Sequence, residues 1–249
     1  CERCGKYCFI SGNSGRFIMT ELPIYYAEVE AIYSQSIGAG YRTISITSAT
    51  KGEGKTTLTE ALVRRAELVG KKVLLVDMNT YNPALSEKLR ILTNQPYKEN
   101  EIITIGDRNF SFLPAPKNFK ALIKYREGKL LLESVNLWLN DFDCIIFDTA
   151  PLTALNQSNV PSEIICEVCD GTILIIEAGK TPTNVVQESI EKLKVKNINL
   201  IGTVINDKSN PSLLTEMLRE TKRLDRFFPK LMCKTREKLT AMVLLNVSI

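Results

Sequence analysis

One short stretch of the chain carries residues that could bind a polyphosphate. The segment TSATKGEGKTT (residues 47–57) lies between a β-branched run and a helical pattern. Backbone N–H groups at the start of a helix attract anions, and glycines allow phosphates to approach the backbone closely. Lys55 would reach the β- and γ-phosphates, the Thr56 hydroxyl would ligate Mg²⁺, and Thr57 would hydrogen-bond a phosphate oxygen. The residues expected to bind the nucleotide here are Lys51, Gly52, Glu53, Gly54, Lys55, Thr56 and Thr57.

Three polar residues further along the chain end apolar, strand-like runs. Asp77 follows KKVLLV, Asp148 follows CIIF, and Asn206 ends INLIGTVI. Aspartates at such places can hold Mg²⁺ directly or through water, or orient the attacking group. Each of the three side chains could instead cap a turn or a helix. The proposed metal ligands are Thr56, Asp77 and Asp148, and the proposed catalytic residues are Lys55, Asp77 and Asp148.

Strands and helices alternate along the chain, and this order must position those residues. Nearly continuous apolar runs are typical of strands covered on both faces, and ligands bind at the carboxyl ends of parallel strands. The sequence therefore predicts an α/β fold with a doubly wound, mainly parallel sheet and helices on both faces. We expect strands at 42–48, 71–77, 144–148, 171–178 and 198–206, and helices at 23–37, 55–69, near 118–139, 183–194 and 211–223.

The length of 249 residues suits one large α/β domain. Residues 1–22 are rich in Gly, Ser and Cys without periodicity, which predicts a flexible N-terminal arm. Residues 23–223 would form the P-loop ATP-binding domain. Residues 224–249 mix basic and apolar residues, and would form a basic tail or helix that packs on the sheet or docks on an anionic membrane.

Composition excludes several other classes of function. The chain contains no histidine, so nucleophile systems and zinc sites that need an imidazole cannot operate. Its net charge of +4 is modest and spread along the chain, so no nucleic-acid partner is expected. Seven cysteines, an odd number with several in apolar runs, are typical of reduced cytosolic thiols. A zinc site could include Cys1, Cys4 and Cys8. A redox pair could form between Cys166 and Cys169, or both could be buried packing residues.

Five motifs together resemble the bacterial tyrosine kinases (BY-kinases) of capsule and exopolysaccharide systems, relatives of the MinD/ParA ATPases. The motifs are TSATKGEGKTT, VLLVDMNTYNP, FDCIIFDTAPL, DGTILIIEAGKTP and IGTVIND. The resemblance implies ATP and Mg²⁺ as cofactors, Asp77 as a metal ligand and candidate base for a tyrosine hydroxyl, Asp148 as a second acid, and Asn206 as the reader of adenine. It also implies a cytoplasmic protein at the inner face of the cell membrane. Its partner would be a chain-length-regulating membrane protein of a polysaccharide system, with a homo-oligomer left open.

The sequence departs from the BY-kinase pattern at several positions. Thr50 stands where MinD/ParA loops carry their signature lysine, so the loop favours the kinase branch. The second aspartate and the arginine that usually follow Asp77 are replaced by Asn79 and Tyr81. Ala31 and Ser34 replace the arginines of the helix before the loop, and no tyrosine follows position 125. A MinD/ParA-type ATPase switch that controls a membrane-associated partner is therefore the alternative to a kinase.

Overall fold

The computed structural model describes residues 26–80, 82–83, 85, 101–105, 109–154 and 159–207, with a few more between 218 and 239. The predicted arm (1–22) lies outside the described residues. Most of the predicted helix 211–223 and of the predicted tail (224–249) also lies outside them. The predicted three-part division of the chain therefore stays a prediction, and the description below concerns the nucleotide-binding domain.

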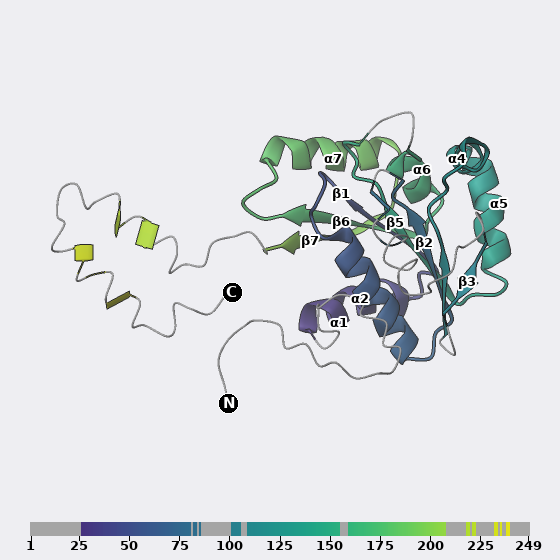
Figure 1. The fold of residues 1–249 in the computed structure, drawn as a ribbon, viewed down its shortest axis with the longest axis horizontal. Coiled ribbons are helices and arrows are strands. Elements are labelled where there is room, and N and C mark those ends of the chain that lie inside the picture. The colour runs from purple at the N-terminus through teal and green to yellow at the C-terminus, as the bar shows by residue number, and fades with distance from the viewer. Residues whose placement is uncertain are drawn as a thin grey trace.

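A seven-stranded sheet forms the centre of the molecule, in the order β3-β4-β2-β5-β1-β6-β7 (Figure 1). All neighbouring strands run parallel except β3 and β4, which pair antiparallel. The predicted doubly wound, mainly parallel sheet is confirmed. The strands are β1 (Thr43–Ser48), β2 (Val73–Met78), β3 (Ile103–Thr104), β4 (Phe110–Leu113), β5 (Cys144–Thr149), β6 (Gly171–Glu177) and β7 (Leu200–Asn206).

Helices cover both faces of this sheet (Figure 1). One predicted helix near 118–139 is two helices, because Glu127 has an extended backbone (φ −85°, ψ 101°) and separates α4 from α5. The helices are α1 (Ala27–Gln35), the 3₁₀ turn η1 (Ile37–Ala39), α2 (Lys55–Leu68), α4 (Phe119–Arg126), α5 (Gly128–Trp138), α6 (Ser162–Glu167) and α7 (Thr183–Val195).

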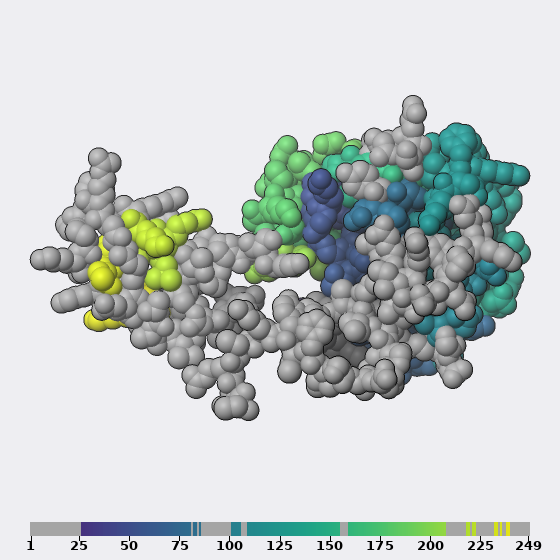
Figure 2. Space-filling model, in the orientation of Figure 1, coloured from purple at the N-terminus to yellow at the C-terminus, as the bar shows by residue number. Residues whose placement is uncertain are grey.

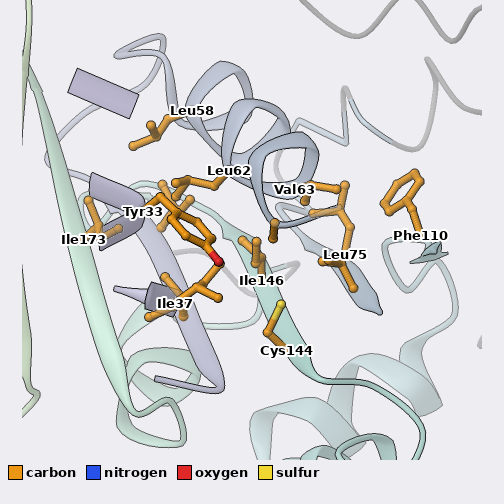
Figure 3. Packing of buried hydrophobic residues seen from close by; sticks show 14 of the residues in the cluster. Tyr33, Ile37, Leu58, Leu62, Val63, Leu75, Phe110, Cys144, Ile146 and Ile173 are labelled. Carbon is orange, nitrogen blue, oxygen red and sulfur yellow. The ribbon is translucent and has the colours of Figure 1, made fainter. Parts of the chain in front are cut away.

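The core is divided into two layers by the sheet, because successive strand residues point to opposite faces. Leu75 of β2 packs with Tyr33 of α1 and Leu62 of α2 on one face (Figure 3). Its neighbours Leu74 and Val76 pack under α4, α5 and α6 on the other face. Burial on both faces explains why β2 and β5 are nearly continuous apolar runs. Strand β1 is also buried throughout, but its sequence TISITS alternates Ile with Thr and Ser.

Helix α2 ends at Leu68, one residue before the predicted boundary at 69. Leu58, Leu62 and Ala66 are buried, but Val69, just beyond the helix, is 49% exposed. Gly70 has φ +81° and donates its N–H to the Glu67 carbonyl, a geometry typical of a helix end. None of the described helices is both long and apolar enough to cross a membrane.

Candidate nucleotide-binding site

The loop between β1 and α2 has the backbone geometry of an anion cradle. Gly52 (φ +83°) and Gly54 (φ +98°) both occupy the left-handed region, which other residues adopt only at a cost. Gly54 is the N-cap of α2, and no side chain caps this end. Within the described residues, the backbone N–H groups of residues 51–57 have no hydrogen-bond acceptor. They are therefore available to an anion at the positive end of α2.

Lys55 begins α2 and lies almost completely buried under this loop. Its ammonium group donates a 2.7 Å hydrogen bond to Ser48 Oγ at the end of β1. Burial lowers the pKa of Lys55, and the negative charges of Asp148 and Glu53 oppose this shift only in part. A bound phosphate would add negative charge beside this buried cation.

Thr56 and Asp148 meet at the base of the loop. The Thr56 hydroxyl donates a 2.7 Å hydrogen bond to Asp148 Oδ2, and Asp148 Oδ1 is buried and has no hydrogen-bond partner among the described residues. Burial raises the pKa of Asp148 to about 6, although Lys55 and the Thr56 hydrogen bond lower it. A buried carboxylate oxygen without a partner is costly unless a ligand satisfies it. Mg²⁺ prefers such oxygen ligands, so the Thr56–Asp148 pair fits the ion.

Asp77 lies next to Asp148, on the neighbouring strand. The two aspartates are partners in the parallel pairing of β2 with β5, so their side chains point to the same face of the sheet. Asp77 is completely buried, and its Oδ1 accepts a 3.0 Å hydrogen bond from the Asn79 backbone N–H. No three carboxylate or thiol groups of the described residues form a metal-binding cluster. Mg²⁺ would therefore also need phosphate or water oxygens.

Asn206 reaches the loop from the end of β7, the edge strand of the sheet. Its Nδ2 donates a 2.9 Å hydrogen bond to the Glu53 carbonyl. A Cβ added at Gly54 would lie only 2.6 Å from this nitrogen, so glycine is needed there for the contact as well as for φ. The structure thus brings Asn206 to the phosphate loop, and its predicted contact with adenine stays a prediction.

The remaining predicted loop residues differ in their surroundings. Lys51 is exposed, and Thr57 is half-buried in the first turn of α2. The Glu53 carboxylate is completely buried and accepts hydrogen bonds inside the protein, from the Thr50 backbone N–H (2.8 Å) and the Thr181 hydroxyl. Only the backbone of Glu53 is therefore left for a nucleotide.

Sequence reasoning missed four residues that contact the loop or lie beside it, namely Ser48, Glu177, Lys180 and Thr181. Ser48 lies in the strand before the loop and was counted only as a strand residue. The other three belong to the segment IIEAGKTP, quoted above as a motif but without a role. Its position at the end of a predicted parallel strand was the available signal.

The sequence profile of the CobQ/CobB/MinD/ParA nucleotide binding domain matches residues 44–242, which include the whole site. The chain belongs to this nucleotide-binding family. Within this MinD/ParA-type family it belongs with the bacterial tyrosine kinases. It is 30% identical to tyrosine-protein kinase CpsD of Streptococcus pneumoniae over 192 residues, which are 69% of this chain and 78% of that protein.

Two further similarities fit this membership. The kinase domain of Escherichia coli tyrosine kinase ETK superposes with a TM-score of 0.60 at 19% identity, covering 79% of this chain and 82% of that domain. Succinoglycan biosynthesis transport protein ExoP of Rhizobium meliloti (strain 1021) is 23% identical over 184 residues, which are 68% of this chain but 22% of ExoP. The first similarity confirms the fold, and the second relates this MinD/ParA-type chain to a polysaccharide-transport protein.

Helix α1 shows what replaces the missing arginines. Ala31 and Ser34 are both exposed, so no positive charge projects from these positions. Glu30 on the same helix forms an ion pair of 2.5 Å with Arg65 of α2. The Arg65 guanidinium also stacks over the buried Tyr33 ring at 4.3 Å. The charged contacts described for α1 therefore attach it to its own domain.

Proposed function

We propose that this chain binds Mg·ATP and transfers the γ-phosphoryl group to tyrosine in a polysaccharide synthesis or export system. The observation that carries the proposal is the Thr56–Asp148 pair. Its buried oxygen without a partner lies at the base of an N–H-lined loop that also holds Lys55. Thr56 and Asp148 would hold Mg²⁺ there, and the ion would supply positive charge for the transferred group. Family membership and the kinase names of the relatives support the same reaction.

Each residue has a role that its contacts allow. The N–H groups of residues 51–57 would bind the phosphates, and Lys55 would stabilise the charge that develops on them during transfer. Thr56 and Asp148 would hold the metal ion. Asp77 is placed to assist the metal or to accept the proton of an incoming tyrosine hydroxyl. Asn206 would recognise the base edge, because an amide offers both a donor and an acceptor.

A second candidate function is an ATPase switch without kinase activity. It is favoured by the exposed Ala31 and Ser34, which supply no arginine to a neighbouring subunit. It is also favoured by Asn79, whose Oδ1 accepts a 3.3 Å hydrogen bond from the Asn82 backbone N–H. An amide is a poorer magnesium ligand than a carboxylate and cannot act as a base. The nucleotide site would then control association with a partner rather than transfer phosphate to protein.

The cellular setting belongs to the same proposal. The resemblance to BY-kinases and the similarity to ExoP support action beside a chain-length-regulating membrane protein, at the inner face of the cell membrane. Such a partner would supply the positive charges that α1 lacks at positions 31 and 34. Kinase activity would then depend on the partner, whereas nucleotide binding would not.

A phosphorylation assay tests the proposal. The protein is incubated with γ-labelled ATP, Mg²⁺ and a tyrosine-containing acceptor peptide, and both phosphotyrosine and free phosphate are measured. A kinase gives labelled peptide that disappears in the Lys55→Met variant. Lysine-dependent phosphate release without phosphotyrosine, even with the cytoplasmic segments of a membrane partner added, would overturn the kinase proposal in favour of the switch.

A further inference from the structure

The turn between β6 and α7 is attached to the phosphate loop. The Glu53 carboxylate of the loop accepts hydrogen bonds from the Thr181 hydroxyl and, at 3.3 Å, from the Glu177 backbone N–H. The same carboxylate binds the Thr50 N–H within the loop. Figure 2 shows the dark blue surface of the β1–α2 region beside the green surface of the β6–α7 region. This turn is therefore packed against the phosphate loop.

Lys180 lies on this turn, next to a glycine of the phosphate loop. Its Nζ is 3.8 Å from the position that a Cβ on Gly52 would occupy. Its ammonium group forms a 2.7 Å ion pair with Oε2 of Glu177, a residue that is only 3% exposed. The Lys180 side chain is itself 54% exposed. The cation is thus held near the loop backbone on one side and open to an incoming ligand on the other.

The charges around the loop explain why a cation is needed there. Glu53 and Glu177 are buried carboxylates beside the segment that would receive a polyphosphate. Like charges at close range oppose binding, and partial burial of the groups strengthens that effect. Lys180 offsets the charge of Glu177. An ammonium group has three N–H donors, and within the described residues Glu177 uses one of them.

We propose that Lys180 is a second phosphate-contacting cation of this site, specific for the di- or triphosphate part of the nucleotide. The inference rests on the proposed nucleotide binding and adds a residue that the loop motif does not contain. Lys55 approaches the phosphates from beneath the loop, whereas Lys180 approaches over Gly52 from the β6–α7 turn. Removal of Lys180 should therefore weaken the binding of ATP and ADP without affecting the binding of adenosine.

Titration calorimetry of Lys180→Met with ATP, ADP and adenosine tests this, in the presence of Mg²⁺. Because the ammonium is half-exposed, we expect a loss of about 3- to 10-fold for ATP and ADP. Lys180→Arg should keep most of the wild-type affinity. The matched control is Lys194→Met on α7. Lys194 also pairs with a glutamate three residues away, at 3.3 Å, and both side chains are 66% exposed.

The outcomes separate this inference from the proposed function. The inference is supported if the wild-type protein binds ATP and Lys180→Met loses more ATP affinity than Lys194→Met does. The affinity for adenosine should not fall. Equal affinities of the two variants, or an equal loss for adenosine and ATP, would overturn the role of Lys180 while leaving the nucleotide site intact. Absence of ATP binding by the wild-type protein would instead contradict the nucleotide site itself. Thermal unfolding of each variant identifies losses that come from misfolding.

Discussion

Replacing Asp148 by asparagine should remove a charge that the folded domain holds at a cost. Burial raises the pKa of this carboxyl from an ordinary value of 3.8 to about 6, so the folded state binds the proton more tightly than the unfolded state. The contribution of this carboxyl to the free energy of unfolding is therefore fully present below about pH 4. It is lost as the pH rises towards and through 6. The charge costs about 3 kcal/mol at pH 7.5 and about half of that at pH 5.

The asparagine would still accept the Thr56 hydrogen bond, and its NH₂ would replace the oxygen that has no partner, at a cost of about 1–2 kcal/mol. We expect Asp148→Asn to be about 1–2 kcal/mol more stable than the wild type at pH 7.5. The difference should shrink by about 1 kcal/mol at pH 5, whatever the amide costs. Urea unfolding of both proteins in EDTA, without nucleotide, measures this.

The Asp148→Asn variant should also lose most of the stabilisation that Mg·ATP gives to the folded protein. Saturating Mg·ATP at about 100 times its Kd would stabilise the wild type by about 2.7 kcal/mol. Asp148→Asn should gain much less, because the ligand that fits the ion is gone. A variant that is less stable than the wild type by the same amount at both pH values would refute the reasoning about burial. Equal stabilisation of both proteins by Mg·ATP would refute the metal assignment.

The remaining predictions concern the loop, the base and the tyrosines. Gly54→Ala should destabilise the domain by more than Gly70→Ala in thermal unfolding, because both have positive φ but only Gly54 has Asn206 within 2.6 Å of the new Cβ. Equal losses would mean that the Asn206 contact is unimportant. Asn206→Leu should weaken ATP by about 1–3 kcal/mol and reduce discrimination against GTP in calorimetry, and unchanged affinities would place base recognition elsewhere. Mass spectrometry after incubation with Mg·ATP should find little phosphotyrosine on the isolated chain, and any within the described residues on the exposed Tyr26 rather than the buried Tyr33. Strong modification would show that arginines at positions 31 and 34 are dispensable.

The sequence predicted the elements whose burial is continuous and missed those that depend on distant partners. Strands β2, β5 and β6 are nearly continuous apolar runs because helices cover both faces, and this is readable locally. The short β4 (Phe110–Leu113) takes its place from parallel pairing with β2, which no local pattern reveals. The break between α4 and α5 occurs at Glu127, a residue that helices otherwise tolerate well.

The site shows the same division. Loop residues such as Gly54 and Lys55 follow from their own spacing, and the places of Asp77 and Asp148 at strand ends follow from the apolar runs before them. The pairing of the two aspartates depends on the order of the strands in the sheet, which was not predicted. The contact of Glu53 with Thr181 could not be predicted, because it joins side chains 128 positions apart in the chain. A glutamate in an exposed-looking loop normally faces solvent, and only the neighbouring turn buries it.

Calorimetric titration of the wild-type protein and of Lys55→Met with ATP and Mg²⁺ tests the central claim most directly. Lys55 is buried and its pKa is lowered, so methionine should preserve the fold while removing the cation that meets the phosphates. The account predicts clear Mg²⁺-dependent binding by the wild type and a loss of at least about 100-fold in the variant. A folded Lys55→Met protein that binds Mg·ATP as tightly as the wild type would contradict it.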